Sequence, residues 1–225
     1  PAQAHPVGAS MKTFVDAFRF MADHPHLLLA KTGEHLELSG AALGIALLLA
    51  LPIGLWLGHL HRGLFAAASV SNVGRALPSL VLIAFGLTIL GVGFWNNTAA
   101  LVVLAIPPVL TNAYFAIDTC DRDAVEAARG MGMTGFQVLM RIELPLGLPF
   151  VLAGIRIAAI FVIATATIAA VAGGGGLGQI IVNQASYGLS GVVAASLWVS
   201  ALAFLSALIL AVVRRAASPS HVPVP

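Results

Sequence analysis

The sequence has little charge, few lysines and a single cysteine. Asp, Glu, Lys and Arg make up 9% of its 225 residues, whereas apolar residues make up 59%. An ordinary soluble domain carries about 25% charged residues, and one soluble core of this size could not bury so much apolar surface. The composition therefore excludes a soluble domain and predicts an integral membrane protein.

The scarcity of cysteine and lysine excludes several kinds of site. One cysteine, Cys120, cannot form an internal disulfide or a cysteine-based metal cluster. Lys12 and Lys31 are the two lysines, and no GxxxxGK[ST] sequence occurs, so the chain has no P-loop for ATP. The dispersed Lys and Arg residues form no patch for nucleic acid. We expect no catalytic group, cofactor or metal in this chain.

Five apolar stretches are long enough to cross a hydrocarbon core of roughly 30 Å. They cover about 39–60, 66–91, 98–117, 146–171 and 192–213. In the first, Gly40-x-x-x-Gly44 and Gly54-x-x-x-Gly58 predict close packing against another helix. The predicted fold class is therefore all-α, a polytopic membrane protein with about five transmembrane helices.

The remaining segments are divided as follows. Residues 1–10 precede Met11 and are expected to be a tag or a disordered terminus, with no cleavable signal peptide. Residues 11–37 have a broken amphipathic pattern that predicts a peripheral helix in the membrane interface. We assign 38–215 to the transmembrane domain and expect 216–225 to be a disordered tail.

Charged and uncharged connections alternate along the chain. Arginines occur at Arg62, within 122–141 and at Arg214-Arg215, whereas 91–97 and 173–191 contain no Lys or Arg. Because arginine-bearing loops stay in the cytoplasm, this alternation predicts the N-terminus outside and the C-terminus inside.

Two local motifs are assigned no ligand. His59 and His61 lie two residues apart and so do not share a helical face, which disfavours a metal site and favours anchoring at the interface. Gly173-x-Gly175-x-x-Gly178 satisfies the dinucleotide fingerprint, but it follows a membrane span rather than a strand. A flexible outward turn, or a seat for a partner, fits this glycine sequence better.

The polar stretch Asp123 to Pro145 interrupts the apolar chain between the third and fourth spans. Asp123 and Glu126 have the spacing of a helix N-cap and its capping-box partner, and Thr134 and Gln137 repeat this spacing. The stretch is therefore expected to contain two short helices.

Between the two boxes, Gly130 and Gly132 can take the positive φ that ends a helix. The second helix is expected to expose more apolar surface than a connector needs, which suggests a protein partner. Packing against the chain's own spans or against lipid is the alternative. The apolar residues are Phe136, Val138, Leu139 and Met140.

The polar stretch also resembles a known signature. Glu126-Ala127-Ala128, three residues, Gly132, nine residues, Ile142, one residue and Leu144-Pro145 match the EAA signature of bacterial ABC importer permeases. The resemblance implies a type I ABC importer permease fold whose cytoplasmic coupling element, 121–145, docks on an ATPase. The residues that it assigns to coupling are Glu126, Ala127, Ala128, Gly130, Gly132, Phe136, Leu144 and Pro145.

The likeness extends to a particular branch of that family. Residues 74–80, 126–134, 148–158 and 164–178 are similar to the osmoprotectant branch, which imports glycine betaine, carnitine and choline. One departure is Ala76-Leu77 where those relatives more often have Thr-Ile. Another small solute such as methionine, or an ATPase-independent channel or secondary carrier, remains the alternative, although no acidic residue lies in the middle of a predicted span.

The resemblance also implies partners and a location. They are cytoplasmic ABC ATPases that bind ATP and Mg, a second permease copy or paralogue, and a solute-binding protein outside the bacterial cytoplasmic membrane. The binding protein is expected to be separate, because the chain stops about ten residues after Arg215. Polar residues within the predicted spans are candidates for the translocation path: Asn72, Arg75, Asn112, Tyr114, Arg156, Thr165 and Thr167.

Overall fold

The computed structural model describes residues 6–63, 65, 69, 72, 74 and 77–217. The contacts divide the chain into two compact units. Unit 1 consists of Pro1–Ala41, Ser79–Leu101 and Val162–Phe204, and unit 2 of Ala42–Pro78, Val102–Phe161 and Leu205–Pro225.

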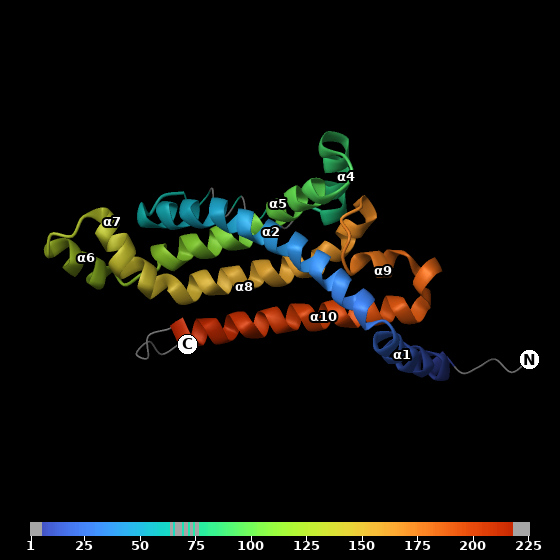
Figure 1. Cartoon of the computed structure of the whole chain (residues 1–225). Coiled ribbons are helices and arrows are strands. Elements are labelled where there is room, and N and C mark those ends of the chain that lie inside the picture. Colours follow the sequence, from blue (N-terminus) through green and yellow to red (C-terminus); the bar gives the residue numbers. More distant parts are fainter. Residues whose placement is uncertain are drawn as a thin grey trace, which may run out of the picture. The chain divides into compact units, whose positions relative to one another are not determined.

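Four helical stretches of the described chain are long and apolar enough to cross a membrane. They are α2 (Pro25–His59), α5 (Phe94–Asp118), the run Gly135–Ala172 that contains α8 (Leu144–Ala169), and α10 (Gln184–Ala217) (Figure 1). The predicted all-α polytopic chain is confirmed.

The second predicted span, 66–91, differs from the structure. Its C-terminal half forms the shorter apolar helix α4 (Ser79–Leu90), which begins directly after Pro78. Proline disfavours helical geometry in the residue before it, so a helix boundary here has a local cause. The N-terminal half of this prediction lies partly outside the described residues.

The N-terminal segment is divided at His24. Helix α1 (Pro6–Asp23) ends just before it, and α2 begins at Pro25, a residue whose missing N–H costs nothing at the first helical position. Residues 25–37, predicted to be part of a peripheral helix, therefore belong to the first long helix. Its charged residues include Lys31 and Glu34, which pair one turn apart at 2.8 Å.

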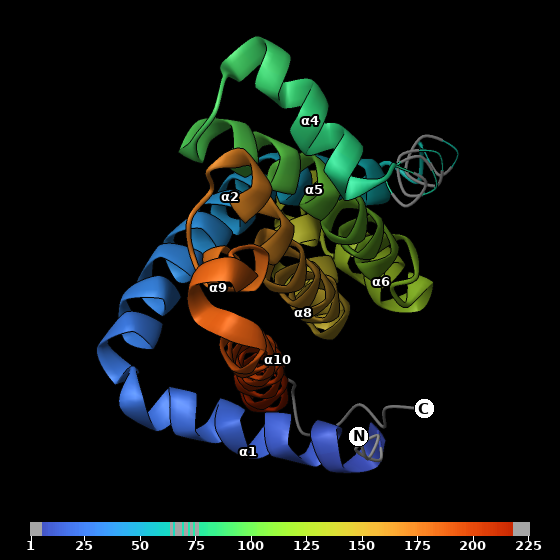
Figure 2. The ribbon, with the colours of Figure 1, turned by 90° about the vertical axis from the view of Figure 1, so that its right-hand side faces the viewer.

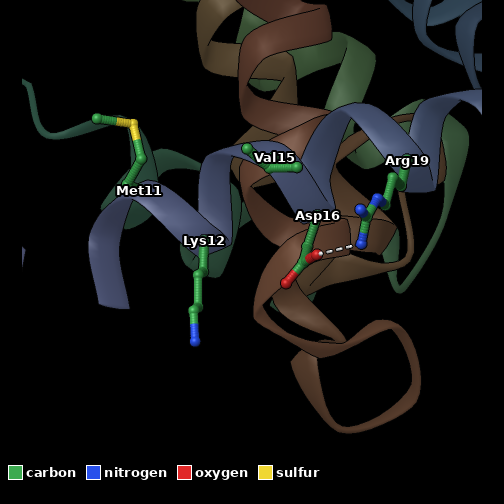
Figure 3. A pocket seen from close by; sticks show the side chains of 5 residues that line it. All are labelled: Met11, Lys12, Val15, Asp16 and Arg19. Atoms are coloured by element: carbon green, nitrogen blue, oxygen red, sulfur yellow. Dashed lines mark ion pairs between the residues drawn. The ribbon is translucent and has the colours of Figure 1, made fainter. Parts of the chain in front are cut away.

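Helix α1 makes an aromatic contact with α10. Charged side chains of α1 also line an open cavity. Phe20 lies edge-to-face against Tyr187 with ring centroids 6.4 Å apart, and Figure 2 shows α1 next to α10. Met11, Lys12, Val15, Asp16 and Arg19 line a cavity of about 330 Å³ (Figure 3). The Asp16–Arg19 pair in it is exposed at 3.5 Å, so it adds little stability. A position of α1 in the membrane interface stays a prediction.

In unit 1, the glycine sequence 173–178 joins η2 (Ala170–Ala172) to α9 (Gly178–Val182). Gly173, Gly175 and Gly176 have positive φ, which glycine adopts without strain. The Gly176 N–H donates to Glu34 Oε2 at 2.8 Å, and Lys31 Nζ donates to both Glu34 oxygens. The predicted flexible turn is thus held by charged side chains of α2.

Asn96 and Asn97 have a structural role that the sequence analysis missed. Both are buried at the start of α5. Asn96 Nδ2 donates to the Ile83 carbonyl at 3.2 Å, and Asn97 Nδ2 donates to the carbonyls of Gly93 at 2.7 Å and Ala172 at 3.1 Å. These amides tie α5 to α4 and η2, and the third predicted span therefore begins at Phe94 rather than at 98.

In unit 2, α2 approaches α5 at its second glycine pair. A Cβ at Gly58 would lie 2.6 Å from the Tyr114 carbonyl oxygen, and Gly54 is equally close to α5. Close packing is therefore confirmed for Gly54 and Gly58. A Cβ at Gly44, or at Gly40 of unit 1, would meet no atom within 4 Å among the described residues, so close packing is not confirmed for the first glycine pair.

Helix α8 also comes close to α5 in unit 2. A Cβ at Gly154 would lie 2.5 Å from Asn112 Cβ, and Gly147 faces the Ala116 carbonyl. These approaches let side chains from α2, α5, η1 and α8 form one apolar core. Its buried members are Leu55, Ala113, Ala116, Ile117, Leu139 and Val151.

Candidate functional site

The coupling element predicted from the sequence begins with α6 (Arg122–Gly130). Its N-cap is Asp121, whose carboxylate accepts from the Asp123 N–H at 2.9 Å. The predicted N-cap at Asp123 is therefore wrong by two residues. Asp123 instead lies in the first turn, where the helix dipole favours an acidic side chain. Glu126 is exposed on this helix.

The turn after α6 depends on one glycine rather than two. Gly132 has φ +83°, and its N–H donates to the Arg129 carbonyl at 2.9 Å. Gly130 is the last helical residue and does not have a positive φ. The predicted conformation is therefore confirmed for Gly132 and wrong for Gly130.

The second capping box is confirmed. Thr134 Oγ1 accepts from the Gln137 N–H at 3.4 Å, and Gln137 Oε1 accepts from the Thr134 N–H at 2.8 Å. The helix that it starts, α7 (Gly135–Val138), continues through the π-helix η1 (Leu139–Glu143) into α8. The second predicted short helix is thus continuous with a membrane span (Figure 1).

The apolar side chains of this second helix divide between two faces. Phe136 is 66% exposed and Met140 is 38% exposed, as predicted, but Val138 and Leu139 are buried. Val138 packs against Val125 of α6. Positions 138 and 139 turn inward because a helical face repeats every three to four residues, so four such close positions cannot share one face.

A cavity of about 260 Å³ lies beside α6. Glu126 faces it together with Arg122 and Arg129 of the same helix. The cavity therefore presents the signature glutamate between two cationic side chains. Its lining residues are His61, Ile117, Cys120, Arg122, Val125, Glu126 and Arg129.

Cys120 is one of the residues that line this cavity, and its thiol is within hydrogen-bond distance of two backbone carbonyls. Its Sγ–H donates to the carbonyls of Ala116 at 3.2 Å and Glu143 at 3.3 Å. Burial, and then the nearby carboxylates of Glu143 and Asp121, raise the pKa of this thiol from 9.0 to about 11. The thiol is therefore protonated at neutral pH.

We expect Cys120 to react slowly with maleimide, because the thiolate is the nucleophile. A pKa of about 11 reduces the thiolate fraction near neutral pH roughly a hundredfold relative to the unfolded chain, and the labelling rate should still rise above pH 9. Mass spectrometry of the purified protein over a pH series measures this rate, with the denatured protein as the control. Equal rates for the folded and denatured protein would contradict the assignment.

Two histidine–carboxylate pairs lie next to this element. His59 Nδ1 is 2.6 Å from Glu143 Oε2, and the two side chains are only 9% and 1% exposed. His61 Nδ1 is 2.9 Å from Asp118 Oδ1. The prediction of simple interfacial anchors missed these partners, which lie 84 and 57 residues away along the chain. Among the described residues, no group of three or more His, Cys, Asp or Glu could hold a metal.

The candidate path residues of unit 2 have varied surroundings. Asn72 is exposed, Arg75 lies outside the described residues, and Arg156 is half-buried. Asn112 Nδ2 donates to a carbonyl of its own helix at 2.8 Å, and Tyr114 is buried. Asn112 and Tyr114 lie where α5 is approached closely by α8 and α2, so both have a packing role.

The candidate path residues of unit 1 are Thr165 and Thr167. Thr165 is buried, and Thr167 Oγ1 donates to the Ala164 carbonyl at 2.7 Å. None of the six candidates that the structure describes lines either of the two cavities described above. Their part in a translocation path stays a prediction.

A match to a known protein family agrees with the assignment made from the EAA signature. The model described as "Binding-protein-dependent transport system inner membrane component" matches residues 50–218, which include every element of the coupling site. The chain belongs to this family. This inner membrane component is therefore a multi-pass transport subunit rather than an enzyme.

Relatives of this inner membrane component align over most of their lengths. The glycine betaine/carnitine/choline transport system permease protein OpuCB of Bacillus subtilis is 36% identical, over 85% of this chain and 89% of the relative. The choline permease OpuBB of the same organism is 34% identical, over 90% and 94%. The osmoprotectant import permease OsmW of Salmonella typhimurium is 32% identical, over 76% and 82%.

Solved structures support the fold of this inner membrane component. An inward-facing MetNI methionine ABC transporter chain matches with a TM-score of 0.73 at 23% identity, over 87% of this chain and 99% of that one. An amino acid ABC transporter chain matches with a TM-score of 0.69 at 22% identity. The predicted ABC importer permease fold is thus confirmed.

Proposed function

We propose that this chain is the membrane-spanning permease subunit of an ATP-driven importer of quaternary-amine osmoprotectants. The observation that carries the substrate class is the 32–36% identity to permeases named for glycine betaine, carnitine, choline or osmoprotectant transport. These relatives are matched over three quarters or more of their own length. The substrate class therefore rests on full-length relatives rather than on a short motif.

We infer that the segment Asp121–Pro145 docks on a cytoplasmic ATPase. Two features of the described chain support this. The capping box and the Gly132 turn fix the backbone of the segment, and Met131 and Phe136 expose apolar side chains at 72% and 66%. A fixed backbone with exposed apolar side chains suits a protein interface, because little ordering entropy is lost on binding.

The remaining assignments follow from this docking. The docked segment is cytoplasmic, so the N-terminus is outside the bacterial cell membrane and the C-terminus inside. ATP and Mg bind to the partner ATPase, since this chain has no P-loop. A second permease copy or paralogue completes the path, and a separate solute-binding protein delivers the substrate.

The alternatives have weaker support. The methionine transporter likeness, at 23% identity, carries the fold and not the substrate. An ATPase-independent carrier has no support from the family match, whose members work with binding proteins. Quaternary amines therefore remain the proposed cargo.

We expect quaternary amines to stimulate ATP hydrolysis by the complete importer. The permease, its ATPase and its solute-binding protein are reconstituted in liposomes and offered glycine betaine, carnitine, choline and, as a control, methionine. Ligand-dependent hydrolysis should rise about tenfold with at least one quaternary amine, because the loaded binding protein favours the hydrolysing state. Stimulation by methionine alone would contradict the substrate class.

A further inference from the structure

The C-terminal end of α2 has an unusual cap. The His61 N–H donates to the Gly58 carbonyl at 2.9 Å, and the Arg62 N–H donates to the Leu57 carbonyl at 3.2 Å. These two bonds are those of a Schellman motif, in which the left-handed residue after the helix is usually glycine. Here that residue is His61, with φ +47°, the one non-glycine among the described residues with a positive φ.

A histidine in this conformation is strained, and strain persists only where other contacts hold the residue. The contact at His61 is its side-chain pair with Asp118 at the end of α5. Glycine would make the same backbone turn without strain but would lose the pair. The turn itself therefore does not require histidine, whereas the side-chain pair does, and this pair adds to the close approach of α2 and α5 at Gly54 and Gly58.

The second pair attaches α2 to the coupling segment. His59 lies in the last turn of α2, where a cationic side chain is favoured, and its Nδ1 reaches Glu143 at the end of η1. Glu143 is 1% exposed, and its other oxygen, Oε1, has no hydrogen-bond partner among the described residues. Because a buried carboxylate without a partner is destabilising, the contact with His59 stabilises Glu143 at this position.

The imidazole of His59 also lies close to the start of α7. A Cβ at Gly135 would be 3.2 Å from His59 Nε2. One side chain of α2 therefore lies beside both ends of the α7–η1 segment. That segment carries the exposed Phe136 and packs against α6 through Val138.

We propose that His59 and His61 are positioning residues that fasten the end of α2 to the coupling segment (through Glu143) and to the end of α5 that leads into it (through Asp118), so that displacement of this segment by the ATPase moves the first membrane helix as well. The inference rests on the proposed coupling function. It assigns a transmission role to α2, which lies outside the EAA signature.

The test uses the complete reconstituted importer and measures substrate taken up per ATP hydrolysed. His61→Gly removes one attachment and relieves backbone strain, so the protein should stay as stable as the unmodified one. His59→Leu/Glu143→Met removes the other attachment without leaving a buried charge unpaired, which keeps the variant foldable. His26→Ala, a change of an exposed histidine in the second position of α2, is the control.

We expect uptake per ATP to fall about threefold or more in both variants and to stay unchanged in His26→Ala. Thermal stability and ATPase association should stay close to those of the unmodified protein. An unchanged ratio in both variants, with or without a loss of stability, would overturn the inference and leave a purely structural role. If the unmodified importer showed no ATP-dependent uptake, the proposed function would fail first, and the inference with it.

Discussion

Gly132→Val is expected to abolish ATP-driven uptake while leaving the membrane helices folded. Gly132 has φ +83°, a conformation in which a β-branched residue is strongly strained. A Cβ there would meet no atom within 4 Å among the described residues, so the damage comes from the backbone and not from a clash. The turn between α6 and α7 would open, and α6 would lose its position beside α7 and η1.

Uptake into proteoliposomes measures this effect, and we expect a loss of about tenfold or more because one positioned docking helix is lost. Gly91→Val is the matched control. Gly91 has φ +73° and is equally open, but it belongs to the turn before α5. If both variants lost uptake equally, backbone strain alone would explain the result and the coupling role of the Gly132 turn would be wrong.

Gly58→Leu is expected to prevent α2 from packing against α5. Even a Cβ at Gly58 would lie 2.6 Å from the Tyr114 carbonyl oxygen and 2.9 Å from Ile117 Cβ. Neither atom can turn away, since one is backbone and the other is the first side-chain atom. Overpacking of a core typically costs about 1–3 kcal/mol, and a clash with backbone lies at the upper end.

The thermal unfolding of the purified protein in detergent measures this loss. Gly44→Leu is the matched control, because Gly44 lies in the same helix in the other glycine pair and meets nothing within 4 Å among the described residues. Gly58→Leu should lower the Tm clearly and Gly44→Leu should not. Equal values for the two variants would show that α2 does not approach α5 at Gly58.

The features predictable from the sequence are those set by nearby residues. The Thr134–Gln137 capping box and the Gly132 turn involve residues within one helical turn of each other. The Gly54–Gly58 pair needs only the rule that small residues allow helices to approach in lipid. The long apolar helices follow from composition and length.

The sequence-based predictions were wrong where two neighbouring residues could fill the same role, and they missed contacts between residues that are far apart in the sequence. Asp121 and Asp123 are both good N-caps, and the local pattern could not distinguish which of them begins α6. Lys31 and Glu34 look like the edge of a span in the sequence, yet they pair with each other inside α2. Charge was therefore an unreliable marker of where a helix starts.

The most informative missed contacts join residues far apart in sequence. His59 finds Glu143, 84 residues later, and no spacing rule relates them. Asn97 likewise binds the Ala172 carbonyl, 75 residues later. Such pairs depend on how the helices cross, which is decided by packing of the whole bundle rather than by local propensity.

We propose that the ATPase binds to the segment from Asp121 to Pro145. Co-purification of the ATPase with the permease from membranes that contain both tests it most directly. We expect the unmodified protein and Gly91→Val to retain the ATPase, and Gly132→Val and Glu126→Lys to lose it while remaining folded in the membrane. Retention of the ATPase by both coupling-segment variants would contradict the account.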